Sequence, residues 1–145
     1  MSIWKSLRTV QEMNSLHEGT LVEHLGIAFT EAGDDFLRAT MPVDRRTRQP
    51  FGLLHGGASV VLAESIGSMG AGMCIDVQEY QCVGQEINAN HVRAGRSGLV
   101  TGTARPVHLG GRSHVWSIDI VNDAGKLVCT SRFTVAIIKR GALGT

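Results

Sequence analysis

The sequence predicts an α+β fold in which one long buried helix packs against a curved antiparallel sheet of about six strands. Two observations lead to this fold class. Apolar and small residues occupy most positions from 56 to 75, and a helix that is apolar on all sides is normally buried. The remaining chain contains runs rich in valine, isoleucine, threonine and aromatic residues. The links between these runs are short, which indicates antiparallel neighbours.

Composition is ordinary for one soluble domain spanning residues 1–145, with 43% hydrophobic and 19% charged residues. A net charge of +1 gives no reason to expect nucleic acid or an anionic membrane as partner. No apolar run reaches the ~18–20 residues of a membrane span, and the first residues do not resemble a signal peptide. The three cysteines form no CxxC pair, which favours a reducing cytoplasm over a disulfide framework.

The elements before the long helix are expected to be short. Apolar residues spaced by three from Trp4 to Leu16 predict one face of a short helix. Two strands are expected over 25–30 and 36–41, because a Glu-Ala-Gly-Asp-Asp turn sequence separates two apolar runs. The polar stretch 42–50, bounded by prolines, predicts a loop.

The long helix contains Gly67, Gly70 and Gly72. Glycine weakens a helix locally but allows a sheet or a second helix to approach its backbone closely. After this helix, the pattern predicts four more strands, over 82–92, 99–107, 114–121 and 127–138. Their glycine-containing links are typical of hairpin turns.

Several common catalytic motifs are missing from the sequence. The His-Gly-Gly run at 55–57 has no accompanying GxSxG elbow, which an α/β-hydrolase requires. The glycines at 67–72 lie inside the apolar helix, where a dinucleotide-binding fingerprint does not occur. The six histidines lack HExxH or HxH spacing, and no cysteine stands near a histidine in a nucleophile pattern. We therefore expect neither a metal nor a cofactor.

One carboxylate, Glu64, lies in the middle of the apolar helix. If the helix begins at Gly56, its first amides have no intrahelical partner and its dipole makes that end partly positive. Such an end can hold a developing oxyanion, with Gln49 and His55 able to add hydrogen bonds. Glu64 is roughly 12 Å further along the axis, too far for one helix to supply both groups to one carbonyl.

A composite site across a two-fold dimer resolves this separation. In two antiparallel copies of the helix, each start faces the other's Glu64, and two-fold dimers are the commonest oligomers. The alternative is a structural carboxylate bonded to an amide or an arginine, with His55 as a helix cap and glycines that only permit packing. The co-occurrence of Gln49, His55, the glycines and Glu64 favours the functional interpretation.

Three stretches carry a family resemblance, MPVD at 41–44, QPFGLLHGGASVVLAESIGS at 49–68 and VGQEINANHVR at 83–93. They resemble the hot-dog fold acyl-CoA thioesterases of the aromatic-acyl branch, typified by phenylacetyl-CoA and 4-hydroxybenzoyl-CoA thioesterases. Within that branch the chain resembles 1,4-dihydroxy-2-naphthoyl-CoA thioesterases and the proofreading thioesterases of enterobactin synthesis. The likeness covers nearly the whole chain.

The resemblance implies a hot-dog fold, an acyl-CoA substrate, no cofactor beyond the coenzyme A of the substrate, and homodimers that pair into homotetramers. It also implies that Glu64 is the catalytic carboxylate, reaching the thioester from the neighbouring subunit. The Gly56 amide, Gln49 and His55 would polarise the thioester carbonyl. Ser68, one helical turn after Glu64, would position the carboxylate or the water.

The resemblance further implies a set of coenzyme A contacts, which are Val83, Asn90, His91, Val92, Arg93, Val107, His108, Leu109, Gly110, Gly111 and Arg112. Arg93 and Arg112 suit phosphate recognition, because guanidinium groups match phosphate oxygens. Met69, Met73 and the segment 74–81 are expected to shape the acyl pocket, and methionine would give that pocket some tolerance.

Alternatives remain open at this level. Glu64 can act as a general base on water, or attack the thioester and form a mixed anhydride. The substrate can be an aromatic acyl-CoA, a broad range of acyl-CoAs or a carrier-protein thioester. A second enzymatic alternative is a hot-dog dehydratase or isomerase acting on a carrier-bound hydroxyacyl chain. Enzymes of that kind lack this arrangement of glutamine, His-Gly-Gly and glutamate. A non-catalytic acyl-CoA binder is the remaining alternative, although the segment before residue 25 has no room for a DNA-binding helix-turn-helix.

Overall fold

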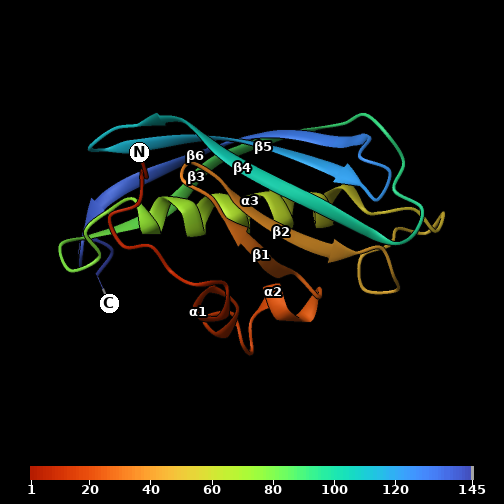
Figure 1. Ribbon diagram of the computed structural model, residues 1–145, viewed down its shortest axis with the longest axis horizontal. Helices are drawn as coiled ribbons and strands as arrows, with labels where there is room; N and C mark the ends of the chain where they lie inside the picture. The colour runs from red at the N-terminus through yellow and green to blue at the C-terminus, as the bar shows by residue number, and fades with distance from the viewer. Residues whose placement is uncertain (145) are drawn as a thin grey trace.

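The computed structural model describes residues 1–144, so Thr145, the last residue of the expected domain, lies outside the described range. These residues form α1 (Val10–Ser15), α2 (Leu21–His24), α3 (Gly56–Met73) and a six-stranded antiparallel sheet. The strands are β1 (Ala28–Ala32), β2 (Leu37–Pro42), β3 (Tyr80–His91), β4 (Leu99–Leu109), β5 (Ser113–Asn122) and β6 (Leu127–Lys139). The sheet curves around α3 (Figure 1), as the sequence predicts. None of the helices within the described range is long and apolar enough to span a bilayer.

The strand order of the sheet is β1-β2-β4-β5-β6-β3. The chain leaves β2, runs through α3 and enters the sheet again as β3 at the opposite edge, beside β6. β3 is 12 residues long and half-exposed or exposed along its whole length. Its outer side presents a long row of unpaired backbone groups, a feature that natural proteins usually cover.

The sheet approaches α3 most closely at two glycines. A Cβ atom added to Gly67 would lie 2.6 Å from Cδ1 of Phe133, and one added to Gly70 would lie 2.8 Å from Cη2 of Trp116. Both aromatic side chains are fully buried in the core. The prediction that glycines permit close packing is confirmed at these two positions. Gly72 differs, because its nearest such neighbour is the Cys82 sulfur at 4.0 Å.

One face of α3 is not covered by the sheet of its own chain. Leu62, Ala63 and Ile66 are fully buried. By contrast, a stripe along the helix is only half-buried, and its members are Val61, Glu64, Ser65, Ser68, Met69 and Gly72. The expectation of burial on all sides is therefore wrong for this stripe in a single chain. This mixed stripe of apolar, small and polar residues is left open to a partner or a ligand.

The amino-terminal segment differs from the prediction in two ways. α1 begins at Val10 rather than at Trp4, because Thr9 and Glu12 form a capping box there. Trp4 instead stacks on Trp116 with 6.3 Å between ring centroids. The short helix α2 was not expected, and it moves the start of the first strand from 25 to 28.

Candidate active site

The start of α3 offers an unpaired backbone donor. Nδ1 of His55 accepts a hydrogen bond from the Gly57 amide at 2.8 Å, so His55 is the N-cap of the helix. No hydrogen bond within residues 1–144 uses the Gly56 N–H, which cannot have an intrahelical partner. The Gly56 amide is therefore free to bind an oxygen atom of a ligand. Because Nδ1 of His55 already accepts a bond, Nε2 is the ring nitrogen left to donate.

Gln49 is held in a tight loop just before α3. Its Oε1 accepts a hydrogen bond from the Phe51 amide at 2.5 Å, and its backbone carbonyl accepts one from Gly52 at 2.9 Å. Gly52 has a φ of +80°, a conformation that glycine adopts readily. With Oε1 occupied, the side-chain nitrogen of Gln49 is available as a donor.

Gln49 and Gly56 line one depression of about 380 Å³, which we call the donor depression. His91, Val92 and Arg93, three of the expected coenzyme A contacts, lie in its wall. A Cβ atom at residue 56 would lie 2.8 Å from Nε2 of His91, so the absence of a side chain at Gly56 lets the exposed imidazole of His91 lie close to the helix start.

The donor depression adjoins a second and larger one. This neighbour has a volume of about 650 Å³ and shares Val92, Arg93 and Ala94 with it, while Arg96 and Ser97 extend it further. Sequence analysis missed Arg96, because the segment around it has the composition of a turn. Two guanidinium groups on one continuous groove suit the phosphates of a nucleotide.

Glu64 lies in a separate pocket of about 380 Å³, which we call the Glu64 pocket. Its lining residues are Arg8, Leu16, His17, Glu64, Ser65, Ser68, Met69, Gly72 and Val77. Ser68 and Met69 were predicted to lie near Glu64, whereas the three residues of the amino-terminal segment were not. Met73, also expected in this pocket, is instead 1% exposed and part of the core.

The Glu64 carboxylate has no hydrogen bond or ion pair with any of residues 1–144. Glu64 is only half-buried and faces this pocket, so its carboxylate is accessible to a ligand. Strand β3 passes close to this carboxylate, since a Cβ atom added at Gly84 would lie 2.7 Å from Oε1 of Glu64.

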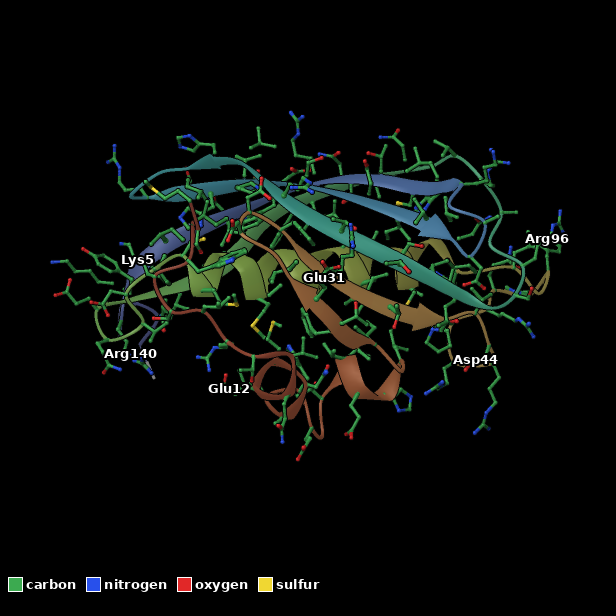
Figure 2. All side chains as sticks on the ribbon, viewed as in Figure 1. Lys5, Glu12, Glu31, Asp44, Arg96 and Arg140 are labelled. Carbon is green, nitrogen blue, oxygen red and sulfur yellow. The ribbon has the colours of Figure 1, made fainter. Side chains whose placement is uncertain are left out.

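The structure does not bring all predicted residues together within one chain. The Glu64 pocket and the donor depression share no lining residue. Leu109, Gly110 and Gly111 line a third pocket of about 400 Å³ with Lys5 and His114. Lys5 lies at the opposite end of the molecule from Arg96 (Figure 2).

The other predicted contacts lie at the surface. Asn90, Val107, His108 and Arg112 are exposed. Val83 is half-buried, and it alternates along β3 with Cys82, whose Sγ contacts the carbonyl oxygen of Ser68 on α3 at 3.8 Å. By strand alternation Val83 faces away from the helix.

Burial changes the titration of several side chains around these pockets. It lowers the pKa of His17, whose ring stacks on Phe29 at 5.5 Å. Burial also raises the pKa of the Cys82 thiol, and it raises that of Cys74 to about 11. Both thiols stay protonated at neutral pH, which does not suit a nucleophile. Nowhere in residues 1–144 do three histidine, cysteine, aspartate or glutamate side chains gather as metal ligands do.

Comparisons with known proteins identify the family of the chain. A family model described as the thioesterase superfamily matches residues 51–129. The chain is 56% identical to the 1,4-dihydroxy-2-naphthoyl-CoA hydrolase of Escherichia coli K12 over 136 residues, 94% of this chain and 99% of that protein. It is 53% identical to the proofreading thioesterase EntH of Cronobacter sakazakii over 137 residues, 94% and 98% of the two chains.

Solved structures give the same result. A crystal structure of mutant thioesterase PA1618 from Pseudomonas aeruginosa superposes with a TM-score of 0.94 at 49% identity, covering 95% of this chain and 99% of that one. Thioesterase HI1161 from Haemophilus influenzae gives a TM-score of 0.92 at 48% identity, covering 94% and 95%. The chain therefore belongs to the thioesterase superfamily, has its hot-dog fold and is a thioester hydrolase.

Proposed function

We propose that this thioester hydrolase cleaves acyl-CoA to a free acid and coenzyme A at a site formed by two subunits. The observation that carries this proposal is the separation of the two halves of the site within one chain. The amide donors of Gly56 and Gln49 line one depression, and the unpaired carboxylate of Glu64 lines another. Thioester hydrolysis needs both halves at one carbonyl group.

Three surface features support the pairing of two chains. The edge of β3 is unpaired, the stripe of α3 around Glu64 is uncovered, and the side chain of Phe51 is 88% exposed. A partner subunit that covered the Phe51 side chain would remove its apolar surface from water. The Phe51 amide donates a hydrogen bond to Gln49, which keeps Phe51 beside the donor depression. In the dimer, Phe51 would therefore lie near the partner's Glu64 pocket. Following the resemblance, two such dimers would then pair into a tetramer.

The chemistry follows from the donors and the carboxylate. The carbonyl oxygen of the thioester accepts hydrogen bonds from the Gly56 amide and the Gln49 side chain, which stabilise the negative charge that develops on it. The partner's Glu64 takes a proton from a water molecule as that water attacks the carbonyl carbon. The carbon–sulfur bond then breaks, and the departing thiolate is protonated by solvent, while the Nε2–H of His55 can donate a hydrogen bond to the substrate. Ser68 lies in the same pocket and would orient the carboxylate or the water.

An alternative course for the same residues begins with direct attack by Glu64. The carboxylate oxygen would bond to the carbonyl carbon and expel the thiolate, leaving a mixed anhydride that water hydrolyses. Both courses need an ionised Glu64 and the same donors, so they share one composite site.

Coenzyme A would lie along the groove that leads from the donor depression past Arg93 to Arg96. The segment 107–112 lies at the opposite end of the same chain. In an antiparallel pair that end approaches the partner's α3 start, which would allow the segment to complete the partner's nucleotide site. The acyl group would occupy the Glu64 pocket, whose volume lies within the ~300–1,000 Å³ range of small-molecule sites.

The acyl group is proposed to be aromatic, such as a dihydroxynaphthoyl or hydroxybenzoyl group. Support comes from the 56% identity to a 1,4-dihydroxy-2-naphthoyl-CoA hydrolase and from the apolar walls that Leu16, Met69 and Val77 provide. The second candidate is a housekeeping thioesterase with a broad range of acyl-CoA or carrier-protein substrates. The 53% identity to a proofreading thioesterase and the adaptable side chain of Met69 favour it. We place either reaction in the cytoplasm.

Replacing Glu64 by glutamine tests the function. We expect Glu64→Gln to keep the fold and lose at least about a hundredfold in kcat, because it loses a positioned base. Thiol release would be followed with benzoyl-, hydroxybenzoyl-, dihydroxynaphthoyl-, hexanoyl- and lauroyl-CoA. The matched control is Glu18→Gln, which changes an exposed glutamate. Turnover at the wild-type rate by Glu64→Gln would overturn the assignment of Glu64. Tight acyl-CoA binding by the wild-type protein without any thiol release would indicate a non-catalytic binder.

A further inference from the structure

The Glu64 pocket contains a cation that the proposed reaction does not use. Arg8 is the only arginine or lysine among its lining residues. The Arg8 side chain is half-buried, and its guanidinium forms no ion pair or hydrogen bond with any of residues 1–144. The described part of the chain thus leaves all five N–H donors of this group unused.

One carboxylate that influences Arg8 through space, Glu12, is already engaged. It lies one turn along the chain, and its Oε2 accepts hydrogen bonds from the Thr9 amide at 2.7 Å and the Thr9 hydroxyl at 2.9 Å. This capping box starts α1 and keeps Glu12 exposed. Glu12 and Arg8 therefore interact through solvent.

The surroundings of Arg8 make its lack of a partner significant. Leu16, Met69 and Val77 give the pocket apolar walls. An acyl group that fills the pocket would displace the water around the guanidinium. A wholly hydrocarbon acyl group would then leave a charged donor unpaired, which is strongly unfavourable. An acyl group with an acceptor oxygen in reach would instead form a charge-assisted hydrogen bond.

We infer that Arg8 binds an acceptor oxygen, a hydroxyl, phenolate or carboxylate, at the end of the acyl group away from the thioester. The inference rests on the proposed function, because the thioester carbonyl must lie beside Glu64 for hydrolysis. The same pocket extends from Glu64 to the amino-terminal segment that carries Arg8. The distal part of the acyl group therefore meets Arg8, and the preferred substrates are oxygen-substituted acyl-CoAs.

Matched substrate pairs test this inference. The pairs are 4-hydroxybenzoyl-CoA with benzoyl-CoA, and glutaryl-CoA with pentanoyl-CoA. For Arg8→Met we expect kcat/KM on the oxygen-bearing member to fall at least about tenfold, the loss expected for a hydrogen bond to a charged group. The unsubstituted member should keep its rate or gain. Arg8→Lys should retain part of the preference, and the pair that responds identifies the oxygen as phenolic or carboxylic.

The control and the contrary outcomes are equally specific. Arg45→Met removes an exposed arginine far along the chain from this pocket and should leave both members of each pair unchanged. An equal fall for both members would overturn the inference, since it would mean that Arg8 acts on Glu64 instead. No fall in either member would also overturn it. Both results concern the Arg8→Met variant and leave hydrolysis by the wild-type protein, and with it the proposed function, standing. A wild-type protein that hydrolyses none of the four substrates would contradict the proposed function itself.

Discussion

The position of the Glu64 carboxylate depends on a residue of another element, Gly84 in β3. A Cβ atom at Gly84 would lie 2.7 Å from Oε1 of Glu64 and 3.1 Å from Cε2 of Phe133. The pairing of β3 with β6 also shifts register between Gly84 and Glu86, so a bulge adjusts the strand at this point. The flexible end of Glu64 is the atom group that would yield to a larger residue.

We predict that Gly84→Ala displaces the Glu64 carboxylate and lowers kcat by about tenfold to a hundredfold, the effect of a misplacement of roughly 1 Å. Kinetics with saturating acyl-CoA measure the loss. The double variant Gly84→Ala with Glu64→Asp is the informative control, because the shorter acid relieves the crowding. Its loss should be smaller than the product of the two single losses. Strictly multiplicative losses would contradict the steric explanation.

Some site residues could be predicted from sequence because their neighbourhood is set by local geometry. Glu64 and Ser68 are four residues apart on a helix and therefore share a face. Gln49 lies in a proline- and glycine-bounded loop directly before the helix start. Arg8 and Gly84 could not be predicted, because their approach to Glu64 depends on where distant segments of the chain cross α3. Local sequence patterns do not indicate which distant segments contact α3.

At the scale of elements, α3 offers a matched pair of glycine substitutions. Alanine is intrinsically better than glycine in a helix by up to about 1 kcal/mol. At Gly72 the nearest atom is 4.0 Å from an added Cβ, so Gly72→Ala should stabilise the fold. At Gly70 an added Cβ would lie 2.8 Å from Trp116, so Gly70→Ala should destabilise it by about 1–3 kcal/mol. Urea denaturation checks both signs, and equal effects would show that propensity rather than packing dominates.

The strands after α3 could be predicted well, because β-branched residues and glycine turns alternate there. Each expected strand differs from the observed one by a few residues at most, as with 82–92 against β3 (Tyr80–His91). The amino-terminal segment could not be predicted as well. There the regularly spaced apolar residues belong partly to α1 and partly to an irregular segment in which Trp4 stacks on Trp116. Apolar spacing alone does not distinguish a helix from an irregular segment that packs on the core.

At the scale of the whole molecule, the half-buried His17 and the buried His114 make stability depend on pH. Burial lowers the pKa of His17, and burial followed by the charges of His108 and Lys5 lowers that of His114, both from an ordinary value of 6.5. A depressed pKa means that the unfolded chain binds protons that the folded protein excludes. The stabilisation is therefore present above pH 6.5 and decreases as the pH falls below it.

We predict that the free energy of unfolding decreases between about pH 7.5 and pH 5.5, and that His114→Gln reduces this decrease. Urea denaturation at both pH values measures it. The control is His24→Gln, which changes an exposed histidine and should leave the pH dependence as it is. An unchanged dependence in His114→Gln would show that His114 does not contribute.

The composite site is tested most directly by mixing two variants that each lack a different half. Glu64→Gln lacks the carboxylate, and Gln49→Ala lacks a donor whose removal should lower kcat by about 10²–10³. In a mixed dimer, one site combines both defects and the other is intact. We predict that co-refolding the two variants in equal amounts restores about a quarter of wild-type activity, the statistical yield for random pairing. Activity no higher than that of the separate variants, with mixed dimers demonstrably formed, would place both halves in one subunit and contradict the composite site.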